Sequence, residues 1–190
     1  MIYNTQNPVA LQSQKWLVEA LLALMREKPY RDIKIKDITN KAQVDRSTFY
    51  RNFSSKEDIL NLHVRQLAET YVKRLKAHKT LSMETVAQIL ITLCFENIQF
   101  LTLLRKEGLS YFVLNHFNEK LPAIQKILAD RFDYQIHPDY VQYALAFNAG
   151  GMWNMLMMWI DNGMKEDISY LIKGFEEIAK FNAMRADKRE

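Results

Sequence analysis

Glycine and proline are scarce in this chain, with 5 Gly and 4 Pro among 190 residues. Strands joined by tight turns need these residues at the turns, so an all-β fold would lack the turn chemistry it requires. The hydrophobic fraction of 48% and the charged fraction of 25% are ordinary for a globular protein that can bury a sizeable core. The sequence therefore predicts an all-α protein.

The single cysteine, Cys94, limits what the chain can build. Neither a disulfide framework nor a cysteine-based zinc site can form within one chain, which favours a reducing compartment. Residues 1–9 lack the basic region and the apolar run of a secretory signal. The expected location is the cytoplasm.

Charge is distributed unevenly along the sequence. Residues 1–79 hold 15 Lys/Arg against 8 Asp/Glu, a balance of +7, whereas residues 80–190 hold 11 against 14, a balance of −3. A basic N-terminal part suits a module that faces a polyanion such as DNA. The alternative is a set of scattered, solvated charges.

Helical spacing of apolar residues, with caps and prolines at the starts, predicts about nine helices. They cover residues 7–28, 35–42, 45–52, 54–75, 82–107, 109–117, 122–132, 138–162 and 165–184. Gln43 and Val44 join the two short helices, Asp45 is the expected cap of the third, and Ser54 and Glu57 form a predicted capping box before the fourth. In this arrangement one helix can enter a DNA groove while its neighbours brace it.

The side chains of the third helix fit that role. Val44, Phe49 and Phe53 are apolar at positions that would face a core. The remaining positions can donate hydrogen bonds, and they are Arg46, Ser47, Thr48, Tyr50, Arg51 and Asn52. The Thr48 and Tyr50 hydroxyls, with Lys56 beyond the helix, suit phosphate oxygens, and the two arginines can form bidentate hydrogen bonds with guanine. The alternative is a compact helical subdomain with a solvated basic face.

Residues 13–62 resemble the DNA-binding domain of the TetR/AcrR family of regulators. The resemblance is carried by Ile38-Thr39-Asn40-Lys41-Ala42-Gln43-Val44, Thr48-Phe49-Tyr50-Arg51-Asn52-Phe53, Ser55-Lys56-Glu57 and Leu60. It implies that Tyr50 and Lys56 clamp the DNA backbone, that residues 46–48 approach the bases, and that Lys36 reaches DNA. With Lys34, these residues complete the expected DNA-binding set.

Three positions depart from the family's pattern. Gln43 lies where a glycine is usual in the turn, at a cost on the order of 1 kcal/mol if its backbone is left-handed. Pro29 replaces a common glycine after the first helix and cannot adopt positive φ, so that junction must close differently. Lys34 stands where a threonine often caps the second helix.

The chain is expected to divide into a helix-turn-helix domain, residues 1–60, and a helical regulatory and dimerisation domain, residues 61–190. One recognition helix covers few base pairs, so such regulators bind as two-fold dimers. Residues 140–160 carry no charge and are apolar around nearly the whole helix, so this helix should be buried on both sides and form a four-helix bundle with the last helix and a second copy. The expected interface residues are Phe147, Gly151, Met155, Met158, Leu171 and Phe175.

A transmembrane helix is the alternative for residues 140–160. Gln142, Asn148 and Asn154 interrupt the apolar run, and no basic residues flank it directly, which favours the buried helix and no membrane partner. The W-x-x-N-G sequence at residues 159–163 also resembles the regulatory domain of a TetR subgroup that includes the dihydroxyacetone-kinase regulators.

A cavity among the middle helices is expected to take a small apolar or aromatic ligand. Its expected lining residues are Phe95, Phe100, Phe112, His116, Phe117 and Tyr143. Ordinary core packing of these rings is the alternative. A ligand bound there would tilt the long helix after Phe53 and change the separation of two recognition helices.

Histidines 63, 78, 116 and 137 lack the spacing of a metal site, and no phosphate-binding glycine loop is present. No enzymatic activity, cofactor or metal is therefore expected. The sequence predicts a DNA-binding transcriptional regulator, a ligand-responsive repressor that acts as a homodimer on a palindromic operator of double-stranded DNA. The alternatives are an activator of the same fold, a helical enzyme, and a helical partner-binding protein without operator binding.

Overall fold

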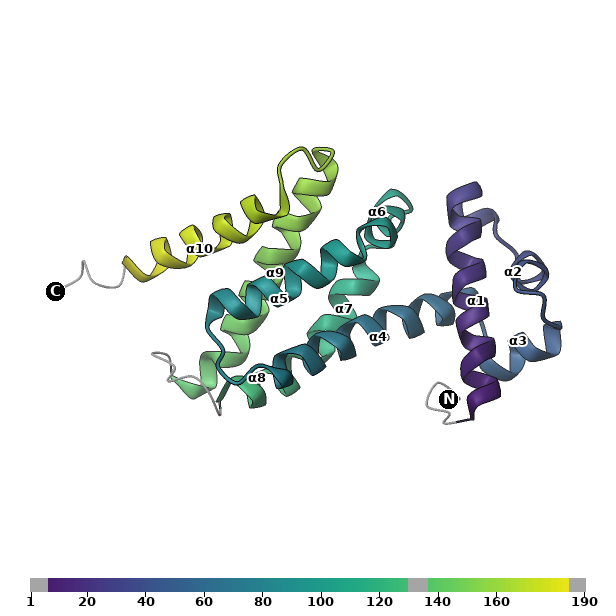
Figure 1. Cartoon of the computed structure of the whole chain (residues 1–190), viewed down its shortest axis with the longest axis horizontal. Helices are drawn as coiled ribbons and strands as arrows, with labels where there is room; N and C mark the ends of the chain where they lie inside the picture. Colours follow the sequence, from purple (N-terminus) through teal and green to yellow (C-terminus); the bar gives the residue numbers. More distant parts are fainter. Residues whose placement is uncertain (1–6, 130–136, 185–190) are drawn as a thin grey trace. The chain divides into compact units, whose positions relative to one another are not determined.

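The computed structural model describes residues 7–129 and 137–184 (Figure 1). Within these ranges the chain forms ten α-helices, one 3-10 turn and no strand, which confirms the all-α prediction. The elements are α1 (Pro8–Glu27), η1 (Tyr30–Asp32), α2 (Ile35–Lys41), α3 (Arg46–Asn52), α4 (Lys56–Ala77), α5 (Met83–Glu96), α6 (Ile98–Lys106), α7 (Tyr111–Glu119), α8 (Leu121–Ala129), α9 (Pro138–Asp161) and α10 (Ile168–Met184). The predicted end of one helix at Phe132 lies outside the described residues.

One predicted helix is in fact two. The helix expected over residues 82–107 is divided at Asn97, whose backbone leaves the helical conformation at φ −112° and ψ 21°. The Asn97 side-chain amide donates a hydrogen bond to the Leu93 carbonyl at 2.8 Å. Such a side chain competes with the backbone ladder and favours a break. The apolar spacing continues across the break, so periodicity alone does not reveal it.

The chain divides into two compact units. The first unit holds the residues up to Gln66 together with Gln99–His116, and the second holds Leu67–Ile98 together with Phe117–Glu190. The helix-turn-helix elements and α6 therefore belong to one unit. The expected domain boundary at residue 60 stays a prediction.

Three helices build the helix-turn-helix part of the first unit. α1 packs against α2 and α3, and α2 packs against α3 (Figure 1). Their core is formed by Leu17 and Leu21 of α1, Ile38 of α2 and Phe49 of α3, all of which are fully buried. Helices of seven residues are unstable alone, so this packing is what keeps α2 and α3 helical.

The second unit is held by apolar contacts among its own helices. α5 packs against α10, α8 against α9, and α9 against α10. Leu93 of α5, Leu128 of α8 and Leu156 of α9 are buried in it.

Neither predicted helix cap forms as expected. Asp45 stands at the cap position of α3 but its side chain makes no capping hydrogen bond. Asn7 caps α1, because its side chain accepts a hydrogen bond from the Val9 N–H at 3.0 Å. The capping box before α4 lies one residue later than predicted. The Asp58 carboxylate accepts from the Ser55 N–H at 3.1 Å, and the Ser55 hydroxyl accepts from the Asp58 N–H at 3.3 Å. Ser55 and Asp58 therefore replace the predicted pair of Ser54 and Glu57.

The unusual residues Pro29 and Gln43 are accommodated in different ways. α1 ends without a left-handed residue, because Lys28 is extended at φ −152° and Pro29 keeps its usual φ of −55°. Gln43 in the turn between α2 and α3 does adopt positive φ, at 55°. The turn thus keeps the backbone geometry that glycine favours, and Gln43 adopts the left-handed conformation at a steric cost.

The membrane alternative for residues 140–160 is not supported. No single helix within the described residues, α9 included, combines the length and hydropathy of a membrane span, and α5 and α6 pass that test only when taken together as a bent pair.

Gln43→Gly should raise the free energy of unfolding by about 1 kcal/mol, because it removes the clash of a side chain in the left-handed conformation. Urea titration followed by circular dichroism measures this change. The neighbouring variant Ala42→Gly is a matched control. Ala42 is right-handed at φ −78°, so glycine there should lower the free energy of unfolding by about 0.5 kcal/mol. A Gln43→Gly variant no more stable than the parent would contradict the strained turn.

Candidate nucleic-acid interface

α3 has one buried and one exposed face. Phe49 is fully buried, and Phe53, directly after the helix, is 2% exposed. Their rings pack with centroids 6.0 Å apart. The opposite face carries the exposed residues Arg46, Ser47, Tyr50 and Arg51. The predicted division into a core side and a hydrogen-bonding side is therefore present in the structure.

Two side chains on the exposed face interact with each other. The Arg51 guanidinium donates a hydrogen bond to the half-buried Thr48 hydroxyl at 2.9 Å. Tyr50 is 52% exposed, and its ring packs edge-on against Phe49 at 5.3 Å between centroids. Its hydroxyl is thus carried outward on a ring that is anchored at its base.

Asn52 does not belong to the exposed face, contrary to prediction. Its side chain is 5% exposed and its amide donates to the Thr48 carbonyl at 2.8 Å. Asn52 follows Phe49 by three positions, so helical spacing places both on the same side. Counting every hydrogen-bonding side chain of the helix missed this distinction.

Lys34 and Lys36, at the start of α2, are both exposed. Within the described part of the chain, neither ammonium group has a carboxylate within 4.0 Å. Arg46 on α3 likewise has no ion-pair or hydrogen-bond partner for its side chain there. Three of the predicted DNA-binding cations are thus available to an external anion.

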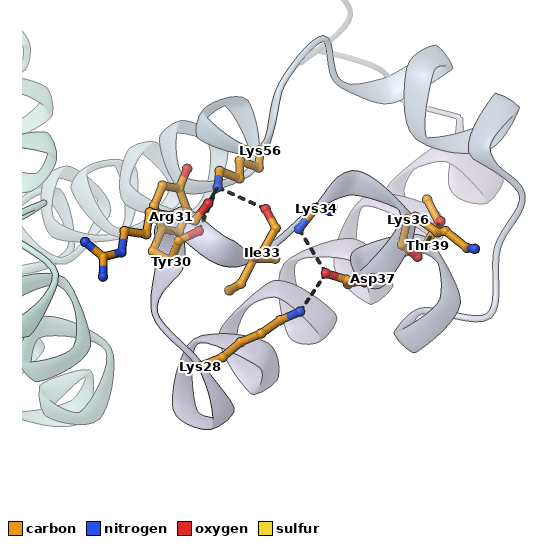
Figure 2. A network of polar contacts seen from close by, with 9 residues as sticks. All are labelled: Lys28, Tyr30, Arg31, Ile33, Lys34, Lys36, Asp37, Thr39 and Lys56. Carbon is orange, nitrogen blue, oxygen red and sulfur yellow. Dashed lines mark hydrogen bonds and ion pairs between the residues drawn. The ribbon is translucent and has the colours of Figure 1, made fainter.

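A carboxylate replaces the missing cap at the start of α2 (Figure 2). Lys34 cannot cap the helix as a threonine would, because its ammonium group accepts no hydrogen bond. Instead Asp37 accepts from the Lys34 N–H at 3.0 Å and from the Lys28 ammonium at 2.6 Å. The Lys28 hydrogen bond, followed by that of the Lys34 N–H, holds the pKa of the Asp37 carboxyl below its ordinary value of 3.8.

Lys56, a predicted phosphate contact, has hydrogen-bond partners within the protein when no DNA is bound. Its half-buried side chain crosses from the start of α4 to η1 (Figure 2). The ammonium group donates to the backbone carbonyls of Tyr30 at 2.6 Å, Ile33 at 3.0 Å and Arg31 at 3.4 Å. It also lies 4.2 Å from the centre of the Tyr30 ring. All its hydrogen-bonding capacity is directed into the protein.

The six residues expected to line one ligand cavity lie in different environments. Phe95 and Tyr143 are exposed, at 45% and 66%. Phe100 is buried against His63 at 4.6 Å between ring centroids, and burial lowers the pKa of that histidine. Phe117 is buried beside Tyr71. The other two are half-buried: Phe112 stacks on Tyr111, and the His116 ring lies 3.1 Å from the Asn61 side-chain oxygen. Core packing accounts for Phe100 and Phe117.

The predicted dimer residues separate into two groups. Phe147, Gly151 and Met158 of α9 are exposed, as an interface with a second chain requires. Leu171 and Phe175 of α10 are instead buried inside the second unit. Met155 lines a small gap with them, together with Ile91, Met152 and Leu156. The buried α10 residues are therefore core, which corrects their assignment to the interface.

Sequence reasoning missed part of the exposed face of α9. The large apolar residues on it are between 60% and 75% exposed, and they are Tyr140, Tyr143, Phe147 and Met158. Their spacing of three, four and eleven residues places them on one side of a helix. That spacing was available in the sequence, but a helix apolar all round hides which side is internal.

Among the described residues, no group of three or more His, Cys, Asp or Glu side chains could hold a metal ion.

The N-terminal part of the chain matches a known family. Residues 17–62 match the family model described as "Bacterial regulatory proteins, tetR family". No curated protein matches the chain.

The fold is similar to three solved structures. The fatty acid degradation regulator FadR from Bacillus halodurans has a TM-score of 0.67 and 16% identity, over 92% of this chain and 96% of that one. The dihydroxyacetone kinase operon activator DhaS has a TM-score of 0.64 and 18% identity, over 87% of this chain and 93% of that one. A TetR transcriptional regulator from Streptococcus agalactiae 2603V has a TM-score of 0.60 and 21% identity, over 91% of this chain and 96% of that one. At these identities the likeness shows a shared fold.

Asp37→Asn should lower the melting temperature at neutral pH, because it removes the charged partner of Lys28. A carboxyl whose folded-state pKa is depressed stabilises the fold above its ordinary pKa and loses this effect as pH falls through the folded-state value. The stability difference between the variant and the parent should therefore shrink as the pH falls below 3.8 towards the folded-state pKa of Asp37. Thermal unfolding at about pH 7 and about pH 3 tests this. Asp32→Asn, an exposed carboxylate in the same segment, is the control, and an equal loss in both variants would contradict the role of Asp37.

Proposed function

We propose that the chain is a sequence-specific DNA-binding transcriptional regulator of the tetR family of bacterial regulatory proteins, whose family model residues 17–62 match. The observation that carries the proposal is the exposed face of α3. There Arg46, Tyr50 and Arg51 lie opposite the fully buried Phe49. Hydrogen-bonding side chains gathered on a helix that two others brace are what recognition in the major groove requires.

The exposed side chains take two proposed roles. Arg46 and Arg51 carry planar guanidinium groups that can pair bidentately with guanine, and Ser47 adds a hydroxyl beside them. Phosphate contacts fix the position of the helix without reading sequence. The residues proposed for this second role are Lys34, Lys36, Thr48, Tyr50 and Lys56.

A homodimer is the proposed DNA-binding form, with a palindromic operator as its target. The exposed apolar face of α9, formed by Tyr140, Tyr143, Phe147 and Met158, supports this proposal. Large apolar side chains gathered on one exposed helix face mark an interaction site. A two-fold dimer through this face would present two recognition helices to half-sites about 34 Å apart.

Repression controlled by a small apolar or aromatic ligand is the proposed mode of regulation. The same fold can also activate, since the sign depends on where the operator lies, and DhaS, one of the similar structures, is an operon activator. A ligand can act only through different affinities for the DNA-binding and non-binding states. Titrating apolar and aromatic compounds against the protein–operator complex tests this, and an operator affinity that no bound compound changes would contradict it.

Arg46→Ala should change sequence preference, because it removes a base contact worth about 1–3 kcal/mol at its base pair. Lys36→Ala should weaken binding to all sequences and reduce the salt slope of log affinity by about 0.9. Selection of bound fragments from a genomic library, followed by binding titrations at several salt concentrations, measures both.

Lys15→Ala serves as the control for these variants, because Lys15 is an exposed α1 lysine paired with Glu19 and outside the proposed interface. Its affinity and salt slope should equal those of the parent. The contact assignment would be refuted if Arg46→Ala kept the parent's sequence preference and Lys36→Ala kept the parent's salt slope of log affinity. A parent chain without salt-dependent DNA binding would favour the partner-binding alternative.

Phe147→Glu should convert the dimer into a monomer of 22.5 kDa. The substitution removes about 2 kcal/mol of apolar burial from the free energy of association in each copy. A two-fold dimer contains the substitution twice, so the dissociation constant should rise by about three orders of magnitude. Sedimentation velocity measures the change. Gln142→Glu places the same charge on an exposed position of α9 away from this face and should remain dimeric. A dimeric Phe147→Glu would rule out this interface.

A further inference from the structure

A groove of about 480 Å³ lies in the first unit, between α1 and the turn that joins α2 to α3. Trp16, Ala20 and Ala23 line it from α1, and their spacing of four and three residues places them on one side of that helix. The two alanines leave space beside the indole, because neither side chain extends beyond Cβ. The volume of the groove is within the range of small-molecule sites.

Trp16 supplies the largest side chain of this groove. It is 45% exposed, and its indole has no ring contact and no hydrogen bond within the part of the chain that the structure describes. Aromatic rings pair with other aromatic rings more favourably than their buried area alone explains. The exposed indole is therefore a surface on which a planar ring can stack.

Gln43 lines the groove from the turn between α2 and α3. Its backbone is left-handed at φ 55°, which is unfavourable for any residue with a side chain. Residues held in such conformations gather at binding sites and switch regions. The amide of Gln43 carries both a donor and an acceptor, and neither has a partner among the described residues. The turn thus retains, at a steric cost, a hydrogen-bonding side chain in the groove.

The two charged residues that line the groove are already paired. The Glu19 carboxylate lies 3.9 Å from the Lys15 ammonium, and the Lys41 ammonium lies 2.7 Å from the Glu27 carboxylate. Both charges are thus balanced within the first unit, so a bound molecule needs no charge of its own. A neutral molecule with a flat face and a hydrogen-bonding edge fits these groups.

We propose that the groove binds a neutral planar aromatic molecule that carries an amide, with its ring on Trp16 and its amide on Gln43. Because Gln43 belongs to the turn directly before α3, the bound molecule would contact the helix-turn-helix itself. An effect of this molecule on DNA binding rests on the proposed function, whereas its binding in the groove does not.

Benzamide is the probe for this site, and cyclohexanecarboxamide, which carries the same amide on a non-aromatic ring, is the matched comparison. The full chain is titrated and the indole N–H signals are followed by NMR, with the Trp16 signal assigned by its loss in Trp16→Phe. Benzamide should shift the Trp16 signal with a dissociation constant on the order of 1–10 mM, as expected of so small a molecule. Cyclohexanecarboxamide should bind about fivefold more weakly.

The indole signals of Trp153 and Trp159, both in the second unit, are the internal reference and should not move. A Trp16 signal that benzamide leaves unchanged would overturn the site. Equal binding of the two amides would overturn stacking on Trp16.

Three variants test the lining of the groove. Gln43→Gly should be more stable than the parent but bind benzamide about fivefold more weakly, because it loses both the strain and the amide. Ala23→Leu should fill the groove and abolish binding. Leu11→Ala is the control, since Leu11 is an α1 residue of similar exposure, 46%, outside the groove, and it should bind as the parent does. Parent-like binding by Gln43→Gly or Ala23→Leu would overturn the assignment.

DNA-binding titrations with and without saturating benzamide test the effect on the helix-turn-helix. Benzamide should change the DNA affinity of the parent and of Leu11→Ala, but not that of Ala23→Leu. A parent affinity that bound benzamide leaves unchanged would overturn this effect. If the parent shows no salt-dependent DNA binding, the proposed function fails, while the NMR titrations still decide whether the groove is a binding site.

Discussion

The burial of Phe49 and Phe53 beneath α3 is the constraint on which the rest of the candidate interface depends. A seven-residue helix does not persist in water by itself, so α3 exists because its aromatic side packs against a core to which α1 contributes. Once that side is fixed, the opposite side is fixed too, and Arg46 and Arg51 face solvent. Folding therefore uses one side of this short segment, and the proposed DNA recognition uses the other.

The cations near this segment are divided between internal and external roles. Lys28 is paired with Asp37, Lys41 with Glu27 at 2.7 Å, and Lys56 with the carbonyls around η1. Lys34 and Lys36 remain exposed. A count of basic residues thus overstates the positive charge offered to DNA. What matters is which ammonium groups lack an internal acceptor. Lys28 and Lys56 brace the connection that precedes α2, whereas Lys41 joins the end of α2 to α1.

Helical periodicity and capping rules were enough to place nearly every helix, and the alternation of Phe49 with polar residues predicted which side of α3 is exposed. These rules failed at positions where the hydrogen-bond partner of a side chain determines the structure. Asn97 ends α5 by bonding to a carbonyl one turn earlier, and the apolar pattern does not change there. Lys56 finds carbonyls 23 to 26 positions away, which no local pattern records. The apolar sequence of α9 likewise predicted burial on both sides of the helix, but in the folded chain Phe147 is exposed to solvent.

The hydrogen bond from Arg51 to Thr48 makes the two arginines that we propose for base recognition unequal. A long side chain loses about 0.5–1.5 kcal/mol of rotamer freedom when it is immobilised in a complex. Arg51 already gives up part of that freedom in the unbound protein, whereas Arg46 is unrestrained among the described residues. In the proposed complex with DNA, contacts made by Arg51 would therefore be partly preorganised, whereas the Arg46 side chain would become ordered only on binding. The exposed face of α3 thus carries one arginine, Arg51, whose side chain is restrained and another, Arg46, whose side chain is free to adjust.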